Sequence, residues 1–156
     1  MSLCIEYISV SELQEYGANA RTHSARQVEQ IAASIREFGF TNPVLVDSEN
    51  ILIAGHGRLA AATLIGMDEI PAVRLSGLSP DQVRALRIAD NQLALNAGWD
   101  LELLAAEVRT LEISDFSLDL LGFEDAFLDD ILSGALSVHG DERSGEHGFE
   151  PDVPDV

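Results

Sequence analysis

The chain has 156 residues and a formal net charge of -18, and all nine of its basic residues are arginine. Without lysine it cannot be a P-loop nucleotidase or an enzyme that works through a lysine base or Schiff base. The charge also disfavours a protein that coats nucleic acid through a basic surface. Hydrophobic residues make up 46% of the chain, which is typical of a globular protein.

The negative charge is concentrated in the last third of the chain. Residues 1–98 carry 7 arginines and 11 acidic residues, a net charge of -4, whereas residues 99–156 carry 2 arginines and 16 acidic residues, a net charge of -14. We therefore expect a domain over 1–98, an acidic helical extension over 99–136 and a disordered linker or tail over 137–156.

Other features set the expected compartment and remove some kinds of site. Cys4 is the only cysteine, so an internal disulfide is excluded. Met1–Ser9 lacks the pattern of a signal peptide, and no apolar run could span a membrane, so we expect a cytoplasmic protein. His139 and His147 are too far apart, in a polar stretch, to indicate a metal site. Trp99 is expected to pack in the core.

The predicted elements begin with a short strand and a helix. Ile5–Val10 alternates as a strand does. Ser24 and Gln27 have the spacing of a capping box, and apolar residues at helical spacing follow them until Gly39.

Next come three strands and a short helix. Pro43–Asp47 and Ile51–Ala54 are expected to form a hairpin, followed by a helix over Leu59–Ile65 and a strand over Ile70–Leu75.

The rest of the predicted structure is helical. Ser79 and Gln82 form a second capping box, and Asp100 caps a further helix. A last helix is expected near Glu124–Leu132. The whole pattern predicts an α+β fold, a small mixed sheet flanked by helices with a helical C-terminal extension.

The most informative segment is Gly55-His56-Gly57-Arg58, between a predicted strand and a predicted helix. The two glycines allow close backbone approach, the helix start offers free N–H groups, and Arg58 adds a guanidinium fork. These features predict a phosphate cradle that needs no lysine. The alternative is an ordinary strand-to-helix turn with a surface arginine. His56 is either a general base or phosphate donor, or a structural histidine.

Two other polar segments are candidates for the same site. The loop Asn19–Ser24 carries Arg21 and His23 and ends in a helix cap. Asp90 and Asn91 interrupt an apolar helix, and such a pair suits Mg²⁺ beside a phosphate. The alternatives are a capping loop and a solvated helix stripe.

Residues 5–96 resemble the ParB/sulfiredoxin-like domain, also described as the ParB-like nuclease domain. Six segments match in order: Asn19-x-Arg21-x-His23, Ser34–Phe40, Asn42–Val46, Ile53–Ala62, Ile70–Val73 and Ala89–Leu93.

The resemblance implies a ligand and its binding residues. In partition proteins of the family, a Gly-Glu-Arg-Arg motif holds the triphosphate of CTP, and a glutamate-asparagine pair helps to bind Mg²⁺. For this chain, the resemblance implies that a nucleoside triphosphate, CTP-like or ATP, binds with Mg²⁺ at Asp90 and Asn91. The implied nucleotide-binding residues are Arg21, His23, Gly55, His56, Gly57 and Arg58.

The sequence also departs from the family. His56 stands in place of the motif glutamate, and Gly57 in place of an arginine, so one phosphate ligand is lost. His56 also occupies the position of the sulfiredoxin cysteine, which excludes sulfinic acid reductase chemistry. The helices over residues 101–132 hold one arginine, Arg109, and cannot supply the phosphate contacts of the family's DNA-binding helix-turn-helix.

The variant motifs and the acidic linker resemble the N-terminal domain of phage and prophage DNA modification methylases. The leading hypothesis is therefore a nucleotide- or phosphate-binding regulatory domain of a DNA-associated protein, either a modification methylase or a partition-type protein. DNA would be contacted through another domain or partner, with a methyltransferase domain downstream, and a homodimer is left open.

Three alternatives remain open. The first is a metal-dependent nuclease, with His56 and Asp90 as catalytic candidates. The second is a nucleotide-dependent phosphotransferase. The third is a non-catalytic interaction module whose acidic helices dock a basic partner.

Overall fold

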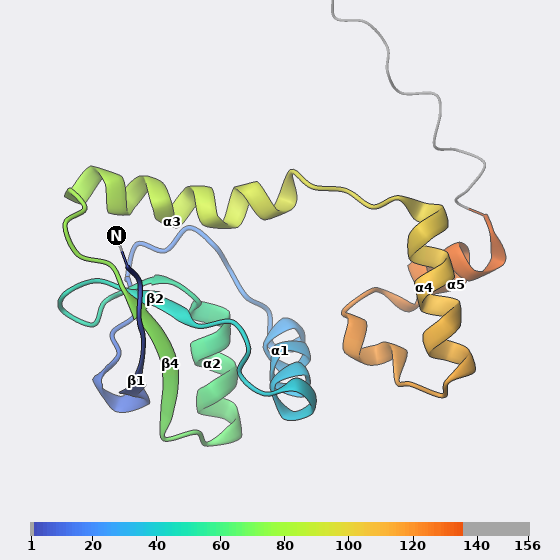
Figure 1. Cartoon of the computed structure of the whole chain (residues 1–156), viewed down its shortest axis with the longest axis horizontal. Coiled ribbons are helices and arrows are strands. Elements are labelled where there is room, and N and C mark those ends of the chain that lie inside the picture. The colour runs from blue at the N-terminus through green and yellow to red at the C-terminus, as the bar shows by residue number, and fades with distance from the viewer. Residues whose placement is uncertain (1, 136–156) are drawn as a thin grey trace, which may run out of the picture. The chain divides into compact units, whose positions relative to one another are not determined.

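The computed structural model describes residues 2–135, which divide between Gly98 and Trp99 into two compact units (Figure 1). Within these residues the first unit contains a four-stranded sheet with helices, and the second is helical. The predicted tail over 137–156 lies outside the described residues. None of the described helices is long and apolar enough to cross a membrane.

The sheet of the first unit has the strand order β1-β4-β2-β3. Its strands are β1 (Ile5–Ser9), β2 (Val44–Val46), β3 (Leu52–Ala54) and β4 (Glu69–Arg74). In β4, Val73 lies opposite Ile5 of the antiparallel strand β1 and opposite Leu45 of the parallel strand β2. Strands β2 and β3 pair as the predicted antiparallel hairpin, so the mixed α+β fold expected from the sequence is confirmed.

Three α-helices belong to the described part of the first unit: α1 (Ala25–Phe38), α2 (His56–Ile65) and α3 (Pro80–Leu95). A short 3₁₀ helix, η1 (Val10–Glu12), follows β1. Helix α2 packs on the sheet through Leu59 and Ala62, and α1 packs on α2. The buried cluster between α2 and the strands consists of Ile8, Val44, Val46, Leu52, Leu59, Ala62, Ile70 and Ala72.

The two predicted capping boxes have different outcomes. Before α3, the Ser79 hydroxyl and the Gln82 side chain each bond to the other residue's backbone N–H, so that box is complete. Before α1, Ser24 Oγ accepts the Gln27 N–H at 3.1 Å, but the Gln27 side chain pairs with His23 instead. The sequence pattern therefore predicted both helix starts correctly, but only the capping box before α3 has both of its hydrogen bonds.

The second unit is built from α4 (Leu101–Ile113), the 3₁₀ helix η2 (Leu118–Leu121) and α5 (Asp125–Ser133). Ala105 and Val108 of α4 pack against Leu128 and Ile131 of α5. The Asp100 carboxylate accepts two backbone N–H groups at the start of α4, as the sequence predicts.

Trp99 does not pack in the core as expected. Its side chain is 63% exposed, and its ring meets the edge of Phe123 with the centroids 5.6 Å apart. It follows Gly98 in the segment between α3 and α4, outside any helix.

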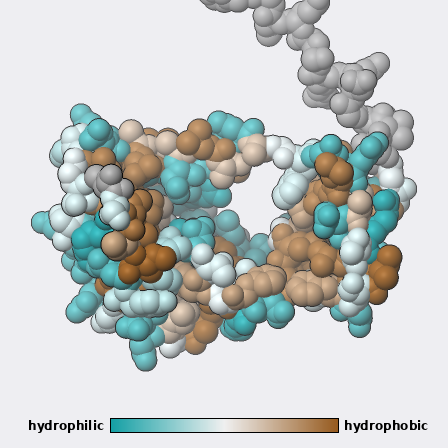
Figure 2. All heavy atoms as spheres, in the orientation of Figure 1, coloured by the Kyte–Doolittle hydropathy of each residue, from teal (hydrophilic) through white to brown (hydrophobic). Residues whose placement is uncertain are grey.

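The outer edge of the sheet carries exposed apolar side chains. Ile5 and Tyr7 of β1, and Leu3 just before it, are each more than half exposed, and Figure 2 shows hydrophobic surface there. Ile8, on the opposite face of the strand, is buried against the core.

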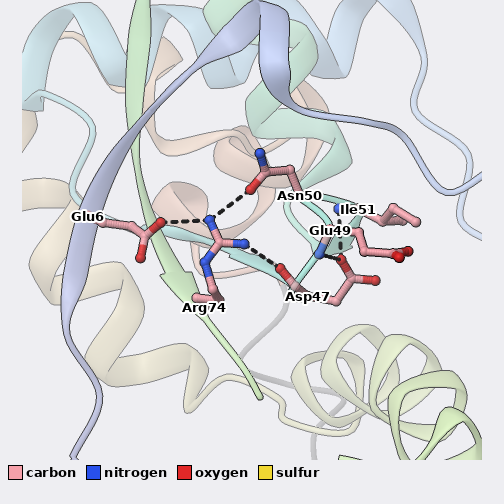
Figure 3. A network of polar contacts seen from close by, with 6 residues as sticks. All are labelled: Glu6, Asp47, Glu49, Asn50, Ile51 and Arg74. Atoms are coloured by element: carbon pink, nitrogen blue, oxygen red, sulfur yellow. Dashed lines mark hydrogen bonds and ion pairs between the residues drawn. The ribbon is translucent and has the colours of Figure 1, made fainter.

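Arg74 at the end of β4 ties β1 to the turn between β2 and β3 (Figure 3). Its guanidinium donates to Glu6 Oε1, to Asn50 Oδ1 and to the Asp47 carbonyl oxygen, each at 2.7 Å. The Asp47 carboxylate in turn accepts the Ile51 N–H at 3.0 Å, which closes the turn.

We expect Arg74→Ala to lower the free energy of unfolding by about 1–3 kcal/mol, because three acceptors lose a charged donor. The Arg74 side chain is 30% exposed, so solvent screening places the value toward the lower end. Urea unfolding measures it. The control is Arg84→Ala, whose side chain is 67% exposed in a 3.5 Å ion pair and should change stability by less than about 0.5 kcal/mol. Equal losses in both variants would contradict this reading of Arg74.

Candidate functional site

The candidate site is built on the turn from β3 into α2. Gly55 occupies the left-handed region with φ +103°, and a Cβ there would lie 2.5 Å from Val44 Cγ1. Only glycine fits both the dihedral angle and the space. Helix α2 begins at His56, three residues before the predicted start at Leu59. The remaining cradle residues therefore form its first turn, where backbone N–H groups lack helical acceptors.

The His56 ring is held by the backbone of the preceding loop. Its Nε2 accepts the Tyr16 N–H at 3.3 Å, so the proton of the neutral ring sits on Nδ1. Burial lowers the pKa of His56, Glu15 raises it, and electrostatic interactions with His23 and Arg87 lower it. His56 is thus a neutral hydrogen-bond donor near pH 7, and at this pH it adds no charge to the site.

Gly57 makes room for His23. A Cβ at Gly57 would lie 3.0 Å from the His23 ring and equally close to Ile31 Cδ1. The His23 ring is fixed by a 3.0 Å hydrogen bond between its Nδ1 and Gln27 Oε1. This contact explains why the Gln27 side chain leaves the predicted capping box, and it brings the start of α1 against the start of α2.

Arg58 has a buried donor without a partner. One of its terminal nitrogens donates to the Pro43 carbonyl oxygen at 3.2 Å. Among the side chains that the structure describes, its Nε is the one buried polar atom without a hydrogen-bond partner. Burial lowers the pKa of Arg58, and the charge of Asp90 opposes that shift. A buried guanidinium N–H without an acceptor fits an anion.

Two adjoining cavities surround these groups. The smaller, about 190 Å³, is lined by Asn19, Arg21, His23, Gln27, Ile31, Gly55, His56, Gly57, Arg58, Asn91 and Ala94. The larger, about 470 Å³, is lined by Tyr16, Ala18, Asn19, Ala20, Arg21, Arg84, Arg87, Ile88, Asn91, Gln92 and Leu95. They share three residues, and neither lining includes a carboxylate. Four of the chain's nine arginines face these cavities.

The structure brings most of the predicted site residues together. The smaller cavity is lined by all six residues expected to bind a nucleotide, and by Asn91. Asp90 is exposed and lines neither cavity, since neighbouring positions on a helix point about 100° apart.

The sequence reasoning missed Tyr16, Gln27, Arg84 and Arg87 as lining residues. Arg84 and Arg87 lie seven and four positions before Asn91 in α3, so helical spacing alone could have placed them on its side of the helix.

Comparison with known proteins matches both units to families. Residues 2–92 match the model of the ParB N-terminal domain, and residues 102–156 match that of the ParB-methyltransferase HTH domain. The second match is to a helix-turn-helix family, although the sequence reasoning treated the acidic helices as a departure from the family's helix-turn-helix.

Individual relatives agree with the first match. The chain is 51% identical over 80 residues to the ParB-like nuclease domain-containing protein YnaK of Escherichia coli K12, covering 51% of this chain and 92% of that protein. It is 36% identical over 74 residues to the probable chromosome-partitioning protein ParB of Treponema pallidum, covering 44% of this chain. The matched part spans only 23% of that partition protein.

One solved structure shares the fold over most of the chain. It is the C-terminally truncated chromosome-partitioning protein ParB from Caulobacter crescentus complexed with CTP-gamma-S, with a TM-score of 0.64. The match covers 86% of this chain and 87% of that one at 21% sequence identity.

We expect Gly55→Ala to lower the free energy of unfolding by roughly 2–4 kcal/mol, because it combines backbone strain with a clash against β2. Thermal or urea unfolding measures the loss. Gly17→Ala is the matched control, since a Cβ at Gly17 has nothing within 4 Å. A Gly55→Ala protein as stable as the control would show that the turn can relax.

We also expect His56 to make the first unit less stable in acid. Its folded-state pKa is lowered, so the unfolded chain binds the proton more readily, and stability falls as the pH drops below about 6.5. Urea unfolding at pH 7.5 and 5.5 should show a smaller pH-dependent loss in His56→Gln than in the unmodified chain. The acidic residues contribute equally to both proteins, so identical losses would contradict the expectation.

Proposed function

Because this chain belongs to the ParB N-terminal domain family, we propose that its two adjoining cavities bind a nucleoside triphosphate and that the domain regulates a DNA-associated protein. One observation carries the proposal. In a chain of net charge -18, four arginines line two cavities from which carboxylates are absent. Such a concentration of positive charge attracts anions.

The phosphates would occupy the smaller cavity. The first turn of α2 presents N–H groups and the positive end of the helix dipole there, and Arg58 offers its unpartnered Nε. Arg21 adds a second guanidinium from the opposite loop. His56 donates from a neutral ring, so it would bind a phosphate oxygen without repelling the arginines.

The nucleoside would occupy the larger cavity. Ala18, Ala20, Ile88 and Leu95 give it apolar walls, and amide side chains supply hydrogen-bonding groups. A cavity of about 470 Å³ is within the range of small-molecule sites. The Caulobacter relative was solved with a CTP analogue, so CTP is the first nucleotide to test.

A magnesium ion fits beside the phosphates with few protein ligands. The Asn91 amide nitrogen donates to the Arg87 carbonyl oxygen, which leaves the amide oxygen available at the cavity wall. Asp90 is the neighbouring carboxylate, close enough for its charge to act on Arg58. Mg²⁺ usually takes one or two such ligands together with substrate phosphates. The ion would neutralise phosphate charge.

The site favours binding over metal-dependent cleavage of DNA. A nuclease gathers several carboxylates around one or two ions. Among residues 2–135 no group of three or more histidine, cysteine or acidic residues is placed to hold a metal.

Residues 99–135, the described part of the second unit, do not offer a basic surface for DNA. They carry ten acidic groups and one arginine, Arg109. That guanidinium already donates to the carbonyl oxygens of Ile131 and Leu132 at the end of α5. We therefore propose that DNA is contacted through another domain or a partner, and the family name of the second unit supports a methyltransferase in that role.

Titration with CTP, ATP, ADP and GTP, each with and without Mg²⁺, tests the proposal by calorimetry. Arg58→Ala should weaken binding at least tenfold, because a buried charged donor to phosphate contributes about 1.5–3 kcal/mol. The matched control is Arg36→Ala, which removes an exposed arginine that lines neither cavity and should change affinity less than twofold. Absence of binding by all four nucleotides, or equal affinity in both variants, would overturn the proposal.

A further inference from the structure

Helix α3 forms one wall of the candidate site but has a weak apolar attachment to the rest of the first unit. None of its sixteen residues is buried. A helix normally docks through an apolar stripe that contributes most of its stability. The placement of α3 must therefore depend strongly on its polar contacts.

Arg87, in the middle of α3, makes two of these contacts. Its Nε donates to the Leu52 carbonyl oxygen of β3 at 3.2 Å. Its guanidinium carbon lies 3.6 Å from the centroid of the Tyr16 ring, a close cation–π stack. One side chain thus joins α3 to the strand that leads into Gly55 and to the loop that crosses the site.

The stack on Tyr16 connects the Arg87 side chain to the site, and the Arg87 backbone contacts a second site residue. The residue stacked under the guanidinium, Tyr16, is the one whose backbone N–H binds His56 Nε2. The Arg87 carbonyl oxygen accepts the Asn91 amide at 2.9 Å, and Asn91 lines both cavities. His56 is therefore linked to the Arg87 side chain through Tyr16, and Asn91 contacts the Arg87 backbone directly.

We propose that Arg87 is the positioning residue of the site: its side chain holds the Tyr16 loop on His56 and fixes helix α3, which carries Asn91 in the cavity wall. Its role in ligand binding rests on the proposed function, but its role in fixing His56 does not. Lysine cannot replace it, because an ammonium group lacks the planar face and the fork that serve both contacts.

The test begins with ligand-free protein. Histidine NMR titration of the full chain gives the pKa of His56, whose signals are assigned by their loss in His56→Gln. Arg87→Ala should raise this pKa, since it removes a nearby positive charge and loosens the loop that buries the ring. Tyr16→Leu, which retains Arg87 but removes its stacking partner, should shift the pKa in the same direction. Arg36→Ala, the charge-matched control, should leave it unchanged.

The second measurement is the affinity for CTP with Mg²⁺. Arg87→Ala should lose at least tenfold, Arg87→Lys should also lose affinity although its charge is retained, and Arg36→Ala should stay within twofold. An unchanged His56 pKa in Tyr16→Leu overturns the positioning role, because the loss of charge alone would raise the pKa in Arg87→Ala. A raised pKa in both variants of a protein that binds no nucleotide supports the positioning role while the proposed function fails. Full affinity in Arg87→Lys shows that charge alone suffices and overturns the geometric argument.

Discussion

The site depends on one steric constraint, the absence of a Cβ at residue 55. Because β3 turns into α2 with a positive φ and against Val44, the chain can reverse within a single residue. The helix then starts at His56, and its free N–H groups open directly beside the end of the sheet. A longer turn would move Arg58 away from the Pro43 carbonyl that orients it. The backbone conformation at Gly55 thus determines where the side chains of the site are placed.

The second organising feature is the separation of charge. Most of the acidity lies after Gly98, and the cavity linings of the first unit collect arginines instead. The same residue type has different uses along the chain: Arg74 and Arg109 close structural contacts on carbonyl oxygens, whereas Arg58 retains a buried N–H without an acceptor. The contacts that each arginine makes therefore indicate its function better than the number of arginines in the chain does.

The sequence predicted the strands, the hairpin and the glycine turn before α2 because each depends on neighbouring residues, such as alternation, glycine spacing and helix caps. It placed the start of α2 at Leu59, since glycines at 55 and 57 read as a loop although Gly57 is helical. Tyr16 and Arg87 were missed because their contact joins residues far apart in the chain. The exposed position of Trp99 depends on tertiary packing, which aromatic composition alone does not determine.

The lack of buried residues in α3 also affects local unfolding of the first unit. Segments with little buried apolar surface separate from a domain at a lower free energy than its core does. Helix α3 has no buried residue, whereas α2 has four, so the amide protons of α3 should exchange with solvent through local detachment. The amides of α2 should exchange only when the first unit unfolds. The wall of the site that carries Asn91 is therefore less stable than the turn into α2, and bound ligand would slow its exchange.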